Sequence, residues 1–267
     1  MKVHHINGAI MTPPVVGRIV AHVLLVEHPT GLVLVDSGFG RADQADRSRI
    51  GPMRALLRPS HDDADTAAAA IERLGHRPED VTDVVLTHLD LDHAGGIADF
   101  PGARIHTTAA EHRAALPRPQ GRDALRYRPA QLTHEARWEI HPGPGDPWSG
   151  PGAAVDLSGI EVLPGITMLP TRGHTRGHTA VAVQSDRGLL VHAGDAVFDG
   201  SVLTDVDPSG RRMRPLRVLR AFEQVIAHDR SRIAGNHAAL RHLQASGEAT
   251  VIPAHDPRVY DALRTLT

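Results

Sequence analysis

The chain has 267 residues, a formal net charge of −2 and no cysteine, so it can form neither disulfides nor thiolate metal sites. Hydrophobic residues at 41% and charged residues at 22% indicate a globular protein of one large or two small domains. A near-neutral charge with 3% aromatic residues argues against a nucleic-acid partner. No apolar run is long enough for a membrane span or a signal peptide, so we expect no membrane contact and a cytoplasmic location.

Short runs of β-branched residues predict the strands of the first half of the chain, at residues 18–28, 31–38, 81–88 and 103–108. Residues 65–75 predict a helix, because Asp65 can begin it, the alanines that follow are strong helix formers and Gly75 can end it. Residues 108–116 predict a second helix. The first half therefore alternates strands with helices.

The second half repeats this scheme. Strands are predicted at residues 165–171, 179–185, 188–195 and 249–255. Helices are predicted at residues 215–228 and 236–247, and a short helix is expected after the last strand. Two groups of strands with helices after each group predict a layered α/β domain with two halves of similar build.

The stretch from Pro117 to Gly152 differs from the rest because it is rich in proline, glycine and arginine. A long irregular stretch inside a compact domain is more often a functional cap than a plain connector, although a surface insertion without a role is the alternative. A cap could select the substrate through its aromatic and basic residues, which are Tyr127, Trp138, Trp148, Arg118, Arg122, Arg126 and Arg128.

The sequence THLDLDHAGG, residues 87–96, follows a predicted buried strand and carries four side chains that can bind a metal, which are His88, Asp90, Asp92 and His93. No straight strand or helix places all four on one face, so we expect a tight turn that brings them toward a common centre. Gly95 and Gly96 would let the backbone pass close to that centre.

Three further stretches have the same construction, a strand that ends in a potential ligand. His174 stands beside Gly173, Asp195 stands beside Gly194, and His255 follows the last predicted strand. A histidine or aspartate at one strand end is commonly a turn former. Four such stretches in one chain indicate a shared metal site instead.

The ordered series His-x-Asp-x-Asp-His, Gly-His-Thr, Gly-Asp and Ala-His-Asp resembles the metallo-β-lactamase superfamily, and in detail its small lactonase-like members. The preceding LVLVDSGFG matches the strand and Asp-x-Gly turn of that family. The resemblance covers nearly the whole chain. It implies one domain over residues 1–267, folded as a four-layer αββα sandwich of two mixed β-sheets flanked by helices, with two metal ions between the sheets.

The resemblance also implies the ligands. The first metal would be held by His88, Asp90 and His174. The second would be held by Asp92, His93 and His255. Asp195 would bridge the two metals. Asp36 would orient ligands through hydrogen bonds. His178 is either a similar supporting group or a structural histidine, and the remaining histidines singled out are expected to be structural or exposed, namely His4, His5, His22, His192, His237 and His242.

Three positions depart from the family pattern. Asp90 replaces the usual histidine, so three carboxylates rather than two reduce the positive charge of the metal pair and weaken the acidification of bound water. Zinc remains the first choice because imidazole ligands dominate, and the extra oxygen ligand makes iron or manganese possible. Alternatively, Asp90 turns away and only one metal binds tightly. Phe198 replaces the tyrosine of the lactonases, and Arg172 replaces a proline.

The resemblance predicts a dinuclear-metal-dependent hydrolase in which a hydroxide that bridges the metals attacks a small ester, with a lactone as the first candidate. Asp92 and Asp195 would be its catalytic carboxylates, Asp92 as the proton carrier. The alternatives are a thioesterase or aryl esterase of the same fold, a non-hydrolytic di-iron redox protein, or a metal-binding protein without turnover. The natural substrate and the oligomeric state do not follow from the sequence.

Overall fold

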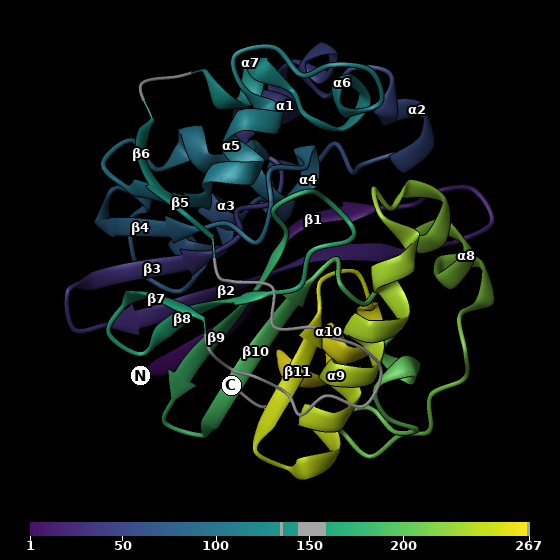
Figure 1. Ribbon diagram of the computed structural model, residues 1–267. Coiled ribbons are helices and arrows are strands. Elements are labelled where there is room, and N and C mark those ends of the chain that lie inside the picture. The colour runs from purple at the N-terminus through teal and green to yellow at the C-terminus, as the bar shows by residue number, and fades with distance from the viewer. Residues whose placement is uncertain (134–135, 144–158, 266–267) are drawn as a thin grey trace.

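The computed structural model describes residues 1–133, 136–143 and 159–265, and these residues form two β-sheets packed face to face with helices on the outside (Figure 1). The first sheet has six strands, and its order follows the sequence from β1 to β6. The second has five strands in the order β11-β10-β9-β8-β7. Both sheets are mixed, which confirms the predicted αββα sandwich.

The strands of the first sheet are β1 (Lys2–Met11), β2 (Ile19–His28), β3 (Gly31–Val35), β4 (Val81–Val85), β5 (Arg104–Thr108) and β6 (Arg137–His141). The strand β2 pairs antiparallel with both β1 and β3, and the strands from β3 to β6 run parallel. Parallel strands place their carboxyl ends at the same edge of the sheet, where α/β proteins carry their chemistry.

The strands of the second sheet are β7 (Ile160–Leu163), β8 (Ile166–Pro170), β9 (Thr179–Ser185), β10 (Gly188–Gly194) and β11 (Ala249–Pro253). The strands from β7 to β10 pair antiparallel, and β10 pairs parallel to β11. The carboxyl ends of β10 and β11 therefore lie side by side.

The α-helices are α1 (Arg41–Ala45), α2 (Met53–Leu57), α3 (Ala67–Arg73), α4 (Leu91–Ala94), α5 (Ala109–Ala115), α6 (Asp123–Arg126), α7 (Pro129–Leu132), α8 (Arg217–Ile226), α9 (Ile233–Ser246) and α10 (Pro257–Leu263). One-turn 3-10 helices connect them at Arg47–Ile50, Asp63–Asp65, Pro78–Asp80, Gly95–Asp99, Gly200–Val202 and Arg230–Arg232. In Figure 1, α3 and α5 lie beside the first sheet, and α9 lies beside the second. The described part of the chain contains no helix long and apolar enough to cross a membrane.

The alternation of side chains along the strands explains the four layers. In β2, Leu24 and Val26 face the second sheet, whereas Val23 and Leu25 pack under the helices of the first. The strand β9 repeats this pattern, with its valines between the sheets and its alanines under α9. Because every second residue points to the same side, a strand that is apolar on both sides must be covered on both.

Most predicted elements are found with shifted ends, but the sequence-based prediction missed β1 and β7 and treated residues 117–152 as irregular. That stretch instead contains α6, α7 and the edge strand β6, which pairs in parallel with β5. Trp138 lies on β6 and packs against the apolar cluster of the first sheet. Residues 144–152, with Trp148, lie outside the described residues, so the cap remains a proposal.

Candidate metal centre

Strand ends bring the predicted ligands together. His88 follows β4 across two residues, Asp195 directly follows β10, and His255 follows β11 across one residue. His174 lies in the loop from β8 to β9. All seven predicted ligands are buried and fall into two groups that could each hold a metal ion. The first group is His88, Asp90, His174 and Asp195, and the second is Asp92, His93 and His255.

The first group converges on two carboxylate oxygens. The Nε2 atom of His174 lies 3.0 Å from Oδ2 of Asp90 and 3.2 Å from Oδ2 of Asp195. The Nε2 atom of His88 lies 3.4 Å from the same oxygen of Asp90 and 3.8 Å from that of Asp195. Donor atoms that all lie this close to one another can share one small cation.

The second group meets the other oxygen of Asp195. Oδ1 of Asp195 lies 3.1 Å from Nε2 of His255 and 3.2 Å from Nε2 of His93. Oδ2 of Asp92 lies 3.6 Å from Nε2 of His255. Asp195 thus turns one carboxylate oxygen to each group, which is the geometry of a bridging ligand.

The electrostatics of the site favour cations. Burial acts to raise the pKa of Asp195, but the charges of His255, His93 and His174 hold it well below its usual value. Burial likewise opposes the shift at His93, where Asp195 and Asp36 raise the pKa well above its usual value. The positive charge of protonated imidazoles thus compensates the negative charge of the buried carboxylates. A metal ion that displaces these protons would compensate the same charge.

Several buried polar atoms at the candidate metal centre have no hydrogen-bond partner, and this bears on whether metal ions fit there. Among the described residues, Nε2 of His88 and the Oδ1 atoms of Asp90 and Asp195 are buried and make no hydrogen bond. Asp90 also stands at the N-terminus of α4 without using its side chain as a cap. Buried polar atoms are rarely left unpaired, so a donor set of this kind fits two divalent cations.

Asp36 and Thr87 hold the two histidines of the opening motif. Asp36 accepts a hydrogen bond from Nδ1 of His93 at 2.8 Å and another from the backbone N–H of Thr87 at 2.8 Å. The Thr87 hydroxyl lies 2.9 Å from Oδ2 of Asp36 and 2.9 Å from Nδ1 of His88. The predicted orienting role of Asp36 agrees with these contacts, because each ring keeps its Nε2 atom directed at the centre.

Two further histidines have defined partners. Nδ1 of His255 donates to the carbonyl of Val20 at 2.8 Å, which directs Nε2 toward Asp195. His178 accepts the backbone N–H of Asp195 on Nε2 at 2.9 Å, and its Nδ1 donates to the carbonyl of Thr171 at 3.1 Å. Of the two alternatives for His178, these contacts favour the supporting group.

The two glycines of the opening motif do not face the metal centre, so that part of the sequence interpretation was wrong. A Cβ atom on Gly95 would lie 2.7 Å from Oδ2 of Asp43, and one on Gly96 would lie 2.5 Å from the carbonyl oxygen of Ser37. These glycines instead allow the turn after α4 to pack against the loop after β3.

Glu111 was missed by the sequence analysis. It is fully buried, and it accepts the backbone N–H of Gly177 at 2.7 Å and that of Leu89 at 3.2 Å. It therefore ties together the two loops that carry His88 and His174. The pattern Thr108-x-x-Glu111 is typical of a capping box at a helix start, and no local pattern of the sequence indicates the longer-range contacts of Glu111.

Two residues proposed to select the substrate have other contacts. Tyr127 is 1% exposed and donates its hydroxyl to Glu111 at 3.0 Å, so it belongs to the core rather than to a substrate surface. The guanidinium of Arg126 reaches the metal centre, where it lies 3.1 Å from Oδ2 of Asp90. Asp90 does not turn away, because the same oxygen faces His174 and His88.

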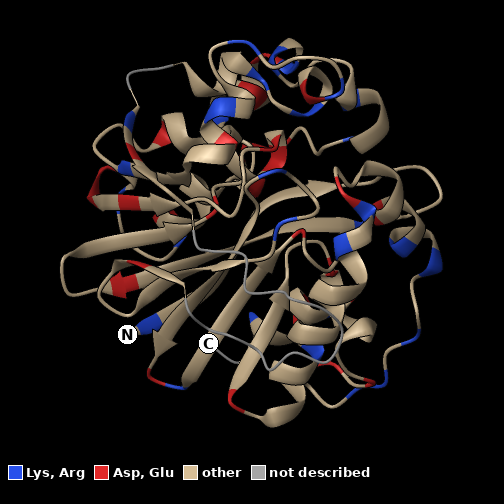
Figure 2. Ribbon diagram, viewed as in Figure 1, with Lys and Arg blue, Asp and Glu red and all other residues tan. Residues whose placement is uncertain are grey.

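A cavity of about 230 Å³ lies over the candidate metal centre. Asp90, Asp92, Asp195 and His255 form part of its lining. Most of the other lining residues are apolar, among them Met53, Leu57, Leu125, Phe198, Phe222 and Ile226. Figure 2 shows an acidic segment at α4, between the two halves of the molecule. Asp92 of this helix lines the cavity.

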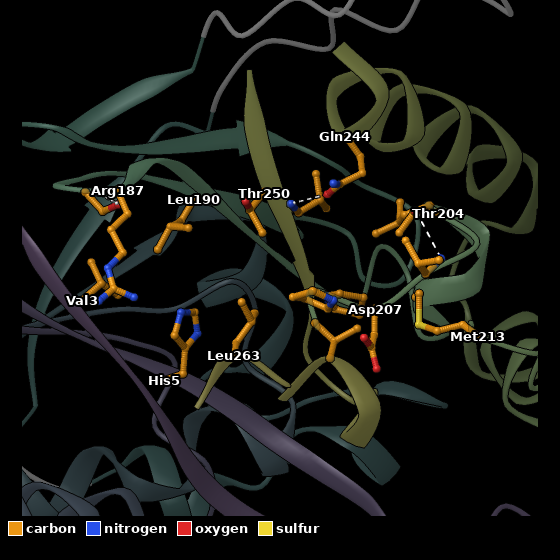
Figure 3. A pocket seen from close by; sticks show the side chains of 18 of the residues that line it. Val3, His5, Arg187, Leu190, Thr204, Asp207, Met213, Gln244, Thr250 and Leu263 are labelled. Carbon is orange, nitrogen blue, oxygen red and sulfur yellow. Dashed lines mark hydrogen bonds between the residues drawn. The ribbon is translucent and has the colours of Figure 1, made fainter. Parts of the chain in front are cut away.

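A larger cavity of about 590 Å³ lies elsewhere, beside β11 and α10. Its lining includes His5, Asp207 and Thr250, which Figure 3 shows around the space with Leu190 and Leu263. None of the seven predicted ligands lines it. The candidate metal ligands therefore lie at the smaller cavity and not at the larger one.

The fold and the two ligand groups define a metallo-hydrolase with a dinuclear site of histidines and aspartates. The family model described as the metallo-beta-lactamase superfamily matches residues 16–255, and the chain belongs to this superfamily. A probable metallo-hydrolase of Mycobacterium tuberculosis is 42% identical over 266 residues, which cover 99% of this chain and 83% of that protein.

The similarity extends to lactonases at lower identity. The N-acyl homoserine lactonase of Bacillus cereus is 26% identical over 187 residues, which cover 69% of this chain and 66% of that enzyme. A solved N-acyl homoserine lactone hydrolase, with the product N-hexanoyl-L-homoserine bound at its catalytic metal centre, matches with a TM-score of 0.70 at 19% identity. That match covers 96% of this chain and 93% of the solved chain.

Proposed function

We propose that this protein hydrolyses a small ester, with a lactone as the first candidate, at two divalent metal ions. The ligands of the first metal are His88, Asp90 and His174, those of the second are Asp92, His93 and His255, and Asp195 bridges both. The observation that carries the proposal is the arrangement of Asp195, whose two carboxylate oxygens each face a separate group of ligands.

Bound at these residues, divalent ions supply an acidified water as the nucleophile and a Lewis acid for the carbonyl oxygen. The protein supplies the positions of both. Asp92 lines the cavity and lies in the second group, so its carboxylate can take a proton during attack and return it to the leaving group. Phe198 and its apolar neighbours exclude bulk water from the same space.

Zinc is the proposed metal. Four of the seven ligands are imidazoles that face the site through Nε2, and nitrogen ligands of this kind are typical of zinc. The carboxylate of Asp90 makes the first group richer in oxygen, so manganese and iron are the alternatives there.

The shape of the cavity supports the substrate class. Its floor holds ligand residues, and its walls are largely apolar, with Phe222 and Ile226 on one side and Leu125 at the rim. A substrate with a polar ester at one end and a short apolar acyl group at the other matches this division. The related lactonases, one of which holds N-hexanoyl-L-homoserine, act on molecules of this kind.

Other acyl compounds stay as alternatives within the same site. Phe198 replaces the lactonase tyrosine and offers no hydroxyl to the carbonyl oxygen, so the more reactive aryl esters and thioesters are the second candidate after lactones. A di-iron redox protein is the other candidate, since Asp90 adds a carboxylate to the first group.

A substrate panel with two ligand variants tests the proposal. Asp195→Ala and His174→Ala should each lower kcat/KM for lactones, aryl esters and acyl thioesters by at least about 100-fold. Asp207→Ala, in the larger cavity, is the matched control and should keep wild-type rates. Hydrolysis that survives in both ligand variants would place the chemistry outside this site, and iron with a reversible redox signal but no hydrolysis would favour the redox candidate.

A further inference from the structure

Arg126 is held by the metal centre on one side and by α8 on the other. Its Nη1 atom lies 3.1 Å from Oδ2 of Asp90 and donates to the carbonyl of His174 at 3.2 Å. Its Nη2 atom donates to the carbonyl of Ile226 at 2.6 Å. Only 16% of the side chain is exposed. A guanidinium with three such partners has one defined position.

The two ligand groups therefore have different charges. Asp90 in the first group has a guanidinium at ion-pair distance, whereas Asp92 in the second group pairs, among the described residues, with the imidazole of His255 of the same group. Asp195 contributes one oxygen to each group. With Arg126 included, the first group has about one negative charge fewer to offer to a metal ion.

We propose that Arg126 offsets the charge of Asp90 and makes the two metal sites unequal, so that the second group fills first and the first group binds its ion more weakly. Charges a few ångströms apart in a buried site interact strongly, and a fixed guanidinium beside a ligand oxygen repels the incoming cation. The consequence is a centre in which one metal is held firmly and the other exchanges more readily. This inference rests on the metal centre proposed above but not on the nature of the substrate.

The direction in which a mutation of Arg126 changes the metal affinity distinguishes a role in charge compensation from a role in positioning Asp90. If Arg126 mainly positions Asp90, its loss frees the carboxylate and weakens metal binding. If it mainly offsets charge, its loss leaves an uncompensated carboxylate in the first group and strengthens binding there. Arg126→Met therefore distinguishes the two roles, and Arg126→Lys retains the charge without the fork of donors.

The experiment is a Zn²⁺ titration of metal-free protein with chelator competition, which resolves two dissociation constants, with thermal melting as a check on folding. We expect Arg126→Met to tighten the weaker constant on the order of tenfold or more, and Arg126→Lys not to tighten it. Asp90→Asn should weaken the same constant, and Asp90→Asn with Arg126→Met should return it toward the wild-type value. Arg122→Met is the control, because Arg122 lines the same cavity but its hydrogen bond goes to the carbonyl of Val225.

The outcomes are separable. A weaker or unchanged constant in a folded Arg126→Met protein would overturn the inference while the metal centre stands. Two equal constants in the wild type would do the same. If Arg126→Met does not fold, Arg126→Gln and the Asp90→Asn pair give the same comparison. A wild-type protein that takes up no Zn²⁺ at all would overturn the metal centre itself and this inference with it.

Discussion

The Nδ1 atom of His93 donates a hydrogen bond to Oδ2 of Asp36 at 2.8 Å, and both side chains are almost fully buried. Asp36 directly follows β3 and His93 lies on α4, so this bond joins the end of a strand of the first sheet to the helix that carries two candidate ligands. A carboxylate on the far side of an imidazole fixes the orientation of the ring and raises its basicity toward a metal.

Asp36→Asn should therefore weaken Zn²⁺ binding by about 10- to 100-fold while the protein stays folded. Chelator competition measures the affinity, and circular dichroism checks the fold. Asp83→Asn is the matched control, because Asp83 is a buried carboxylate that accepts from His106 at 2.8 Å away from both ligand groups. A loss of Zn²⁺ affinity that is equal in both variants would show that Asp36 acts only through stability.

Glu111 offers a second prediction. Glu111→Gln replaces an acceptor by a donor next to backbone N–H groups of Gly177 and Leu89, so we expect it to lower the free energy of unfolding by about 1–3 kcal/mol. Tyr127→Phe removes only one of the donors to this carboxylate and should cost about 1 kcal/mol. Urea unfolding of both variants tests the order. A larger loss in Tyr127→Phe would mean that the two backbone contacts contribute little.

The apolar wall of the cavity predicts a chain-length effect. Each added methylene of an acyl ester should raise kcat/KM about fourfold until the wall is covered, because a buried methylene is worth about 0.8 kcal/mol. Leu125→Asp at the rim should reduce this gain. Leu74→Asp is the control, since Leu74 is also exposed but does not line the cavity. Equal chain-length effects in the two variants would show that the acyl group does not bind against Leu125.

His5 predicts a pH dependence of stability. Burial lowers its pKa from 6.5 to about 4, and its Nδ1 atom lies 2.9 Å from Nε2 of His22. Below pH 6.5 the unfolded chain takes up a proton at His5 that the folded protein does not bind until the pH approaches 4. The free energy of unfolding therefore decreases as the pH is lowered through this window.

In His5→Gln, the loss of unfolding free energy between about pH 7.5 and about pH 5 should be smaller than in the wild type by about 2 kcal/mol. Urea unfolding at the two pH values measures both differences, and contributions common to the two proteins, including any release of metal, cancel in the comparison. The same pH dependence in both proteins would show that His5 is not buried in its neutral form.

The layered fold could be predicted from the sequence, and the predicted ligands are residues that the structure brings close together. Both predictions depend on local features of the sequence. The runs 32–35 and 180–183 are apolar at every position, which predicts burial on both sides. His88, Asp195 and His255 follow strands, and the carboxyl ends of neighbouring strands meet at one edge of the fold. These features depend on short stretches of sequence that can be interpreted independently.

The features that were missed depend on contacts between distant residues. Arg126 meets Asp90 across 36 positions of sequence, and its neighbours in the stretch gave no indication that one arginine among several is buried. Glu111 contacts loops on either side of it in the sequence, at Leu89 and Gly177, and no local pattern indicates these contacts. The edge strand β6 was missed because a strand of mostly exposed residues has little apolar pattern to reveal it.

The most direct test of the account is the number of divalent cations bound per chain, measured by elemental analysis after Zn²⁺ loading and removal of excess metal. We expect two Zn²⁺ ions per wild-type chain, about one in His174→Ala and in His255→Ala, and none retained in Asp195→Ala. Wild-type protein with no bound cation, or an Asp195→Ala variant that still retains both, would contradict the bridged pair of sites on which the account depends.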